Sequence, residues 1–330
     1  MADRKKWLWP VAAALCLLGT VLSLCLGAVK LTPGELWQAV TGGPDSTAGY
    51  IFWYSRLPRT FACLLSGAAL AVSGCILQSV LGNKLASPGI IGVNAGAGLA
   101  VTLCCACGVL SGWAVSAGAF AGAMAAVLTV VLLAKKTGAS RTTVILSGVA
   151  MNSILNALRD AVTTLVPEAG LLGSDFRVGG FSAVSSARLV PAAVLIVAAL
   201  AVTFTLCNEL DVLALGEETA RSLGLSVEKI RTLFLLLAAV LAGAAVSFAG
   251  LLGFVGLIVP HAVRRLAGSE SRYLLPLCAL TGAGFVTICD LISRLAFAPF
   301  ELPVGILMSI LGGPVFLLLL LKGKGGRSHD

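Results

Sequence analysis

The chain has little charge for its length, and this shortage excludes a soluble globular protein. Only 12% of its 330 residues are charged and 58% are hydrophobic, whereas a soluble domain carries about 25% charged residues. Apolar windows of about 20 residues, the length that a membrane-spanning helix needs, recur along most of the sequence. The composition therefore predicts an all-α polytopic membrane protein.

Histidine is scarce too, since the chain has only His261 and His329. No constellation of nucleophile and base can be recognised around them, so an intramembrane enzyme is disfavoured. His261 follows Pro260 at a helix break, and we expect it to be structural.

The sequence also lacks the patterns that hold phosphates or metals. The stretch "KGKGGRS" at residues 322–328 does not have the P-loop spacing of glycines before Lys-Ser/Thr. The ten cysteines fall mostly in apolar segments, which favours buried packing over a metal or redox site. We therefore expect no cofactor on this chain, and any ATP and Mg to be bound by a separate ATPase.

The net charge of +8 would suit nucleic acid, but the positions of the basic residues favour a membrane topology without a nucleic-acid partner. Sixteen of the 23 Lys and Arg residues fall on the predicted cytoplasmic side, as the positive-inside rule expects. Both termini are then cytoplasmic. The predicted segments are 7–29, 60–81, 90–110, 112–134, 142–166, 189–207, 232–250, 253–263, 273–295 and 302–321.

Two of the predicted features differ from ordinary spans. Segment 253–263 is too short to cross the membrane and contains Pro260, so we expect a broken or half-depth helix. Residues 32–40, "TPGELWQAV", predict a short amphipathic helix at the outer surface, with an ordinary surface loop as the alternative. The 38 glycines indicate spans that pack closely, because small residues let helix backbones approach each other in a membrane.

A faint internal repeat joins the two halves of the chain. "GAALAVSG" at residues 67–74 and "GAAVSFAG" at residues 243–250 share four of eight positions. The predicted topology runs the first inward and the second outward. The chain is therefore expected to contain inverted repeats, an architecture typical of transporters.

The segment at residues 208–231, "NELDVLALGEETARSLGLSVEKIR", reads as soluble helix and lies on the predicted cytoplasmic side. Glu217 suits a helix N-terminus and pairs with Arg221 four residues on. Gly224 can end the helix and Ser226 can cap the next one. Two short helices that meet at a glycine need a packing partner. The alternatives are a second protein, bound through Leu215, Ala220, Leu223 and Leu225, and the chain's own membrane domain.

Five stretches together resemble the permease subunits of ATP-binding cassette (ABC) importers for iron-siderophores, haem and cobalamin. The resemblance covers nearly the whole chain. The stretches are "RLPRTFACLLSGAALAVSG" (56–74), "QSVLGNKLASPGIIGVNAGAG" (78–98), "LGEETARSLGL" (215–225), "GFVGLIVPHAVRRLAG" (253–268) and "ELPVGILMSILGGPVF" (301–316).

This resemblance implies a single permease domain over residues 1–330, with about ten transmembrane helices in the fold of the cobalamin permease. It also implies a homodimer, or a dimer with a close paralogue, in the bacterial cytoplasmic membrane. Two ABC ATPase subunits would bind its cytoplasmic side, and an extracytoplasmic binding protein its outer side. The ATPase-coupling residues implied are Leu215, Gly216, Glu217, Glu218, Ala220, Arg221, Leu223 and Gly224.

Further residues take roles from the same resemblance. Arg56, Arg59 and Arg294 match arginines that meet acidic residues of the binding protein, although arginines near span ends also reach the interface for solvation alone. Leu85 and Thr142 match a cytoplasmic gate. The chain has Lys84 where the family usually has proline, which predicts a less rigid turn beside Leu85.

The resemblance also implies a translocation pathway along segment 142–166 and the inner end of segment 60–81. Asn152, Asn156 and Arg159 are spaced to share one face of a helix, and polar groups in a span are costly unless they face a cavity or a partner. Arg159 and Asp160 at the outer boundary, adjacent to water, are the alternative.

The function that the resemblance implies is movement of an iron chelate into the cytoplasm, with a ferric siderophore first, haem next and cobalamin third. The permease itself is not expected to be an enzyme. The alternative is a secondary transporter driven by an ion gradient, which needs acidic residues near the midplane. Asp290 lies toward the end of its segment and Asp160 has Arg159 beside it, so candidates are few.

Overall fold

The computed structural model describes residues 2–27, 29–136, 140–296 and 300–324, and every regular element in these ranges is helical. Each of the ten predicted segments contains one main helix. These helices are α1 (Ala2–Cys25), α4 (Leu57–Val80), α5 (Val93–Ala106), α6 (Gly112–Lys136), α7 (Arg141–Leu165), α10 (Ser186–Thr205), α13 (Val227–Ala249), α14 (Val255–Ala267), α15 (Ser271–Leu295) and α16 (Val304–Lys324).

Six helices in the described ranges are long and apolar enough to cross a membrane. They are α1, the α4 helix with its N-terminal extension, α6, α10, α13 and α15. Helix α7 has the length of a span but is more polar, and α5, α14 and α16 are shorter or interrupted by proline. The fold class is confirmed as all-α and polytopic, while the count of ten spans stays a prediction.

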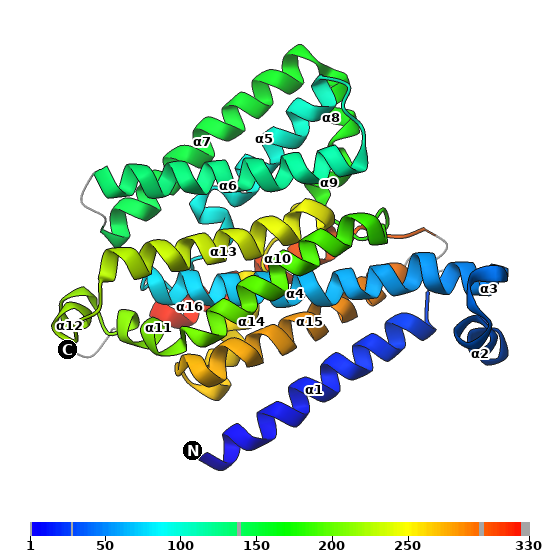
Figure 1. Ribbon diagram of the computed structural model, residues 1–330, viewed down its shortest axis with the longest axis horizontal. Helices are drawn as coiled ribbons and strands as arrows, with labels where there is room; N and C mark the ends of the chain where they lie inside the picture. The colour runs from blue at the N-terminus through cyan, green and yellow to red at the C-terminus, as the bar shows by residue number, and fades with distance from the viewer. Residues whose placement is uncertain (1, 28, 137–139, 297–299, 325–330) are drawn as a thin grey trace.

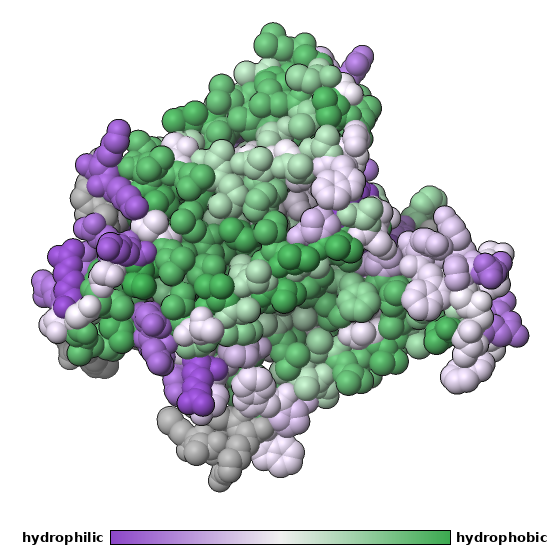
Figure 2. All heavy atoms as spheres, in the orientation of Figure 1, coloured by the Kyte–Doolittle hydropathy of each residue, from purple (hydrophilic) through white to green (hydrophobic). Residues whose placement is uncertain are grey.

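Helices α4, α13 and α15 form the buried middle of the bundle, and α10 crosses their surface, packed mainly on α13 (Figure 1). Helix α1 lies along one edge and packs on α15, and helices α5, α6 and α7 pack together on the far side of α13. Figure 2 shows a broad apolar surface over the sides of the bundle, with hydrophilic residues gathered mainly toward its two ends. This distribution suits a bundle surrounded by lipid.

Glycines bring the central helices into backbone contact. A Cβ atom on Gly67 of α4 would overlap the carbonyl group of Gly282 on α15. A Cβ on Gly74 would likewise overlap the backbone of Gly256 on α14. The sequence-based expectation of close packing at glycine is therefore confirmed at these two crossings.

Helix α4 is longer than its predicted segment, because helix α3 (Thr47–Tyr50) and the π-helical turn η2 (Ile51–Arg56) continue into it. The resulting helix covers 34 residues, Thr47–Val80. The predicted amphipathic helix is present as α2 (Pro33–Gly42), where Thr32 and Glu35 form a reciprocal capping box. Hydrogen bonds from Thr32 lower the pKa of Glu35 below its ordinary value.

The two stretches of the predicted repeat lie on α4 and α13, which pack together and run in opposite directions (Figure 1). The Ser73 hydroxyl of α4 donates to the carbonyl of Ala238 on α13 at 2.7 Å. The opposite directions agree with the predicted topology. That the two halves are inverted repeats stays a prediction.

Candidate functional site

The charged segment folds as two short helices at one end of the bundle (Figure 1). Helix α11 (Cys207–Ala214) is followed by helix α12 (Glu217–Ser222), and the span α13 begins at Val227. Gly224 has φ of 83°, so the predicted left-handed terminator is confirmed. Ser226 occupies the N-cap position of α13 without a side-chain hydrogen bond, so the predicted cap is wrong.

Glu217 bridges two arginines. One carboxylate oxygen accepts from Arg221 at 2.8 Å, which confirms the predicted pair, and the other accepts from Arg231 of α13 at 2.9 Å. The hydrogen bond from Arg231 lowers the pKa of Glu217 below its ordinary value. Sequence reasoning did not single out Arg231, because a partner 14 residues away gives no local spacing signal. The bridge ties α12 to the first turns of the membrane helix α13.

The apolar residues of this segment divide between the chain and solvent. Leu215 and Leu223 are 64% and 61% exposed. Ala220 is fully buried, and Leu225 is partly buried against the core of the same chain. The expectation that all four face a partner is therefore wrong for Ala220 and Leu225, whose packing partner is the membrane domain itself. The two exposed leucines remain available to another protein.

Three long helices, α7, α13 and α15, hold this helix pair. In addition to the Glu217 bridge to α13, the Arg141 side chain at the start of α7 donates to the carbonyl of Leu213 at 2.9 Å. The carboxylate of Asp211 accepts from the hydroxyl of Ser271 at 2.6 Å and from its backbone N–H at 2.9 Å, at the start of α15. A displacement of α11 and α12 would therefore act on α7, α13 and α15 together.

The predicted pathway residues lie on α7. Asn152, Asn156 and Arg159 are half-buried, in keeping with their common helical face. The Asn152 amide donates to the carbonyl of Gly89 at 2.8 Å, in the short helix η3 (Pro88–Ile91). Arg159 pairs with its neighbour Asp160 at 2.9 Å, and Asp160 is exposed. Their role in translocation stays a prediction.

The predicted gate residues belong to neighbouring parts of the chain. Leu85 is half-buried in the turn after α4, and Thr142 is exposed in the first turn of α7. The guanidinium of Arg141 lies against Gly82 in the same turn as Leu85. The structure therefore brings the two regions together, while their action as a gate stays a prediction.

The turn beside Leu85 is held without the family's proline. The side chain of Asn83 accepts from the backbone N–H of Leu85 at 2.9 Å, and the carbonyl of Asn83 accepts from Ala86 at 3.0 Å. An Asx turn of this kind replaces part of the restraint that proline would supply. Lys84 is exposed.

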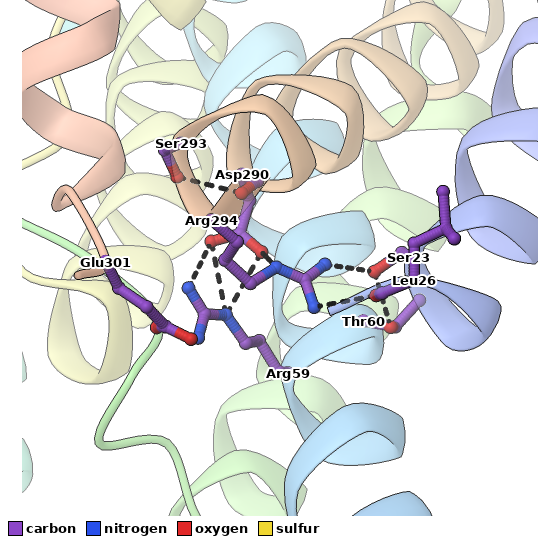
Figure 3. Close-up of polar contacts among 8 residues, drawn as sticks. All are labelled: Ser23, Leu26, Arg59, Thr60, Asp290, Ser293, Arg294 and Glu301. Carbon is purple, nitrogen blue, oxygen red and sulfur yellow. Dashed lines mark hydrogen bonds and ion pairs between the residues drawn. The ribbon is translucent and has the colours of Figure 1, made fainter. Parts of the chain in front are cut away.

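A buried cluster of charges joins α4 to α15 (Figure 3). Arg59 Nη2 lies 3.0 Å from Asp290 Oδ1, and Arg59 Nε lies 3.1 Å from Oδ2. Arg294 Nε lies 3.0 Å from Oδ2, close enough for an ion pair although its N–H is not aligned as a hydrogen bond. The carboxylate of Asp290 is thus held between two guanidinium groups. A further contact of 2.6 Å joins Arg59 Nη1 to the carboxylate of Glu301.

The remaining arginine contacts lead to α1. Arg56 donates to the carbonyls of Leu24, Cys25 and Val29 at 2.8, 2.7 and 2.6 Å. Arg294 Nη2 donates to the hydroxyl of Ser23 at 2.8 Å (Figure 3). These bonds fasten the C-terminal end of α1 to the central helices.

The three arginines predicted to meet a binding protein are therefore inside the chain. Arg56, Arg59 and Arg294 are 4%, 9% and 3% exposed, so the alternative of solvated arginines at span ends is wrong for this arrangement. Their contact with a binding protein stays a prediction, and it requires a guanidinium to exchange an internal partner for an external one. The four-residue spacing of Asp290 and Arg294 was a signal for their pairing, whereas Glu301 had none.

Among the residues that the structure describes, no group of three or more His, Cys, Asp or Glu side chains is placed to hold a metal ion. The arrangement instead offers mechanical connections. A polar helix pair is attached to three long helices at one end of the bundle, and an ion-pair cluster joins the central helices elsewhere. Together with the apolar helices, these connections fit a membrane permease.

Comparison with known proteins agrees with this class. The FecCD transport family matches residues 15–322, and the chain belongs to that family. The protein is a permease subunit of an ABC importer of the metal-chelate and vitamin B12 type.

Individual relatives support the same assignment. The chain is 38% identical over 327 residues to the vitamin B12 import system permease protein BtuC of Citrobacter koseri, covering 97% of this chain and 95% of that protein. It is also 38% identical over 325 residues to BtuC of Salmonella typhi, covering 96% and 95%. Both alignments span nearly the whole length of each protein.

Two solved structures share the fold. An inward-facing metal-chelate type ABC transporter has a TM-score of 0.85 and 27% identity, with 96% of this chain and 99% of that chain covered. PsaBC from Streptococcus pneumoniae, solved with a Fab, has a TM-score of 0.57 and 15% identity, with 86% and 94% covered. The second likeness concerns the fold alone.

Proposed function

We propose that two copies of this chain, or one copy and a close paralogue, form the membrane channel of an ATP-driven importer in the bacterial cytoplasmic membrane. A binding protein delivers cargo at the outer face, and two ABC ATPase subunits dock at the cytoplasmic face, where both termini lie. ATP and Mg are bound by those subunits. The observation that carries the proposal is the α11–α12 pair, which presents Leu215 and Leu223 to solvent while it is bonded to three long helices.

The cargo is a bulky metal chelate. A ferric siderophore is the candidate from the sequence motifs, with haem next. A corrinoid is favoured by a separate observation, the 38% identity to permeases named for vitamin B12 import. Substrate selectivity would rest largely on the binding protein, which makes transport assays the direct way to separate these chelates.

The ion-gradient alternative finds little support in the site. A coupling carboxylate must be free to bind and release a cation, but the carboxylate of Asp290 is occupied by ion pairs with Arg59 and Arg294. Asp160 is exposed and paired with Arg159. Neither is a buried carboxylate without a basic partner.

Uptake into proteoliposomes tests the proposal. The complex purified from native membranes, with its ATPase and binding protein, is reconstituted and supplied with labelled cyanocobalamin, a ferric siderophore or haem. We expect uptake of one of these that requires ATP and survives collapse of the ion gradients by ionophores. Uptake that continues without ATP and stops with the ionophores would replace the importer proposal by the secondary transporter.

A further inference from the structure

Arg59 makes two ion pairs of different character. Its pair with Asp290 is closed, because the Asp290 side chain is 1% exposed and both oxygens face guanidinium groups. Its pair with Glu301 is open, because the Glu301 side chain is 32% exposed and meets Arg59 through one contact of 2.6 Å. Removing a buried partner is far more costly than removing a half-exposed one. Glu301 is therefore the exchangeable partner.

The cluster also carries more positive than negative charge. Arg59 and Arg294 are paired with two carboxylates, Asp290 and Glu301. Arg56 adds a third guanidinium group, which donates to the carbonyls of Leu24 and Cys25, next to the Leu26 carbonyl that Arg294 contacts, instead of to an anion. A surplus of guanidinium charge at the edge of a low-dielectric region attracts another carboxylate. The half-exposed Glu301 edge of Arg59 is the place where such a group can enter.

Glu301 lies in the segment that leads into α16. The next residue, Leu302, donates its backbone N–H to the carbonyl of Ser293 at 3.2 Å, and α16 begins at Val304. Gly305 then donates to the carbonyl of Gly179 at 3.1 Å. The Arg59–Glu301 ion pair is therefore one of the few contacts that fix the segment leading into α16 to the central helices.

We propose that Glu301 holds the place of a binding-protein carboxylate on Arg59, and that docking displaces it and releases the segment leading into α16. This inference rests on the proposed function, since it requires an acidic docking partner. Arg59 keeps its bonds to Asp290 during the exchange, so only the outer edge of the guanidinium changes partner. A docking event at the outer face would thereby reach a membrane helix.

The test uses the intact permease–ATPase complex in lipid nanodiscs and the binding protein that co-purifies with the tagged chain. Glu301→Gln removes the internal competitor and should tighten binding about tenfold, equivalent to about 1.4 kcal/mol. Glu301→Ala removes the carboxylate without leaving an amide in its place. It should also tighten binding of the binding protein, and it separates loss of the charge from any disturbance by the glutamine amide. Glu168→Gln is the matched control, because Glu168 is an exposed acid of helix α8 (Pro167–Leu172). The affinity of the binding protein for this variant should differ little from that for the unmodified complex.

Hydrogen exchange of a peptide covering residues 300–308 reports the release. Docking should accelerate exchange there in the unmodified complex, and Glu301→Gln should accelerate it before docking. Binding that is unchanged or weaker in both Glu301 variants, or exchange that docking leaves unaltered, would overturn the inference. A binding protein that fails to bind even the unmodified complex would instead contradict the proposed function.

Discussion

Glu217 of α12 and Arg231 of α13 form an ion pair of 2.9 Å in which the arginine side chain is 3% exposed. The pair joins the short helix α12 to the first turns of the span α13. Because Arg231 is buried and Glu217 is half-buried, this contact is stronger than a surface ion pair. It is the connection through which a push on α12 would enter the membrane domain.

Glu217→Gln should weaken transport without unfolding the permease. The change removes the charge from both hydrogen bonds of the bridge, and a hydrogen bond to a charged group contributes about 1.5–3 kcal/mol. We expect the ratio of substrate moved to ATP hydrolysed to fall at least about tenfold, as a loss of about 1.4 kcal/mol of coupling implies. Measurements of uptake and phosphate release in proteoliposomes check this.

Glu228→Gln is the matched control for that change, because Glu228 is an exposed acid in the first turn of α13 and is not among the predicted coupling residues. The ratio of substrate moved to ATP hydrolysed by this variant should stay near that of the unmodified complex. Equal ratios for the two variants would show that the bridge carries no coupling.

The bridge should also define a pH limit. Since the pKa of Glu217 is lowered from its ordinary 4.5, the folded chain favours the charged carboxylate. The stabilisation is then present above pH 4.5 and is lost as the pH falls through the lowered pKa. Thermal unfolding of the unmodified protein and of Glu217→Gln, followed from pH 7 to pH 3, should show a constant difference above pH 4.5 that shrinks toward zero below it. A difference that grows on acidification would contradict this sign.

Gly74→Ala should destabilise the bundle, because a Cβ at this position overlaps the backbone of Gly256. Overpacking of a close contact costs about 1–3 kcal/mol, and here the obstacle is backbone rather than a flexible side chain. Gly253→Ala is the control, since a Cβ there meets nothing within 4 Å. Melting temperatures in detergent compare the two, and equal values would mean that the α4–α14 crossing is looser than described.

Asp290→Asn should lower stability strongly, because it leaves Arg59 and Arg294 without their shared carboxylate. Loss of one partner of a buried ion pair costs about 3–5 kcal/mol. Asp45→Asn, at an exposed aspartate, should leave the melting temperature unchanged. A stable Asp290→Asn protein that has lost only its dependence on an ion gradient would favour an ion-coupled carrier instead.

The sequence predicted the position of a helix well where a long apolar window marks it. Each of the ten windows contains a main helix, and the short α2 was expected from its amphipathic pattern and Thr32 cap. The start at Thr47 of the continuous helix formed by α3, η2 and α4 was missed, because residues 47–56 are less apolar and continue into α4 through a π-helical turn. Boundaries of this kind depend on tertiary packing rather than on local propensity.

The candidate sites were less predictable, because pairing between distant residues depends on how the helices pack. Arg59 and Asp290 are 231 residues apart, and no spacing rule connects them. The charge and glycine pattern of residues 208–231 predicted two short helices, whereas a role of residues 215–224 in ATPase coupling was implied by the family resemblance and stays a prediction. Which leucines face outward could be settled only by the packing of Ala220 and Leu225 against the chain's own core.

The central claim is that α12 and its exposed leucines bind a separate ATPase. Its most direct test is co-purification of the tagged chain from its native membrane, compared between Leu223→Asp and Leu165→Asp. Leu165 is the control, because it is also an exposed leucine but lies at the C-terminal end of α7, away from α12 in the sequence. We predict that an ABC ATPase accompanies the unmodified chain and Leu165→Asp, and is lost from Leu223→Asp while the permease remains folded. Retention of the ATPase by Leu223→Asp, or its absence from the unmodified chain, would contradict the account.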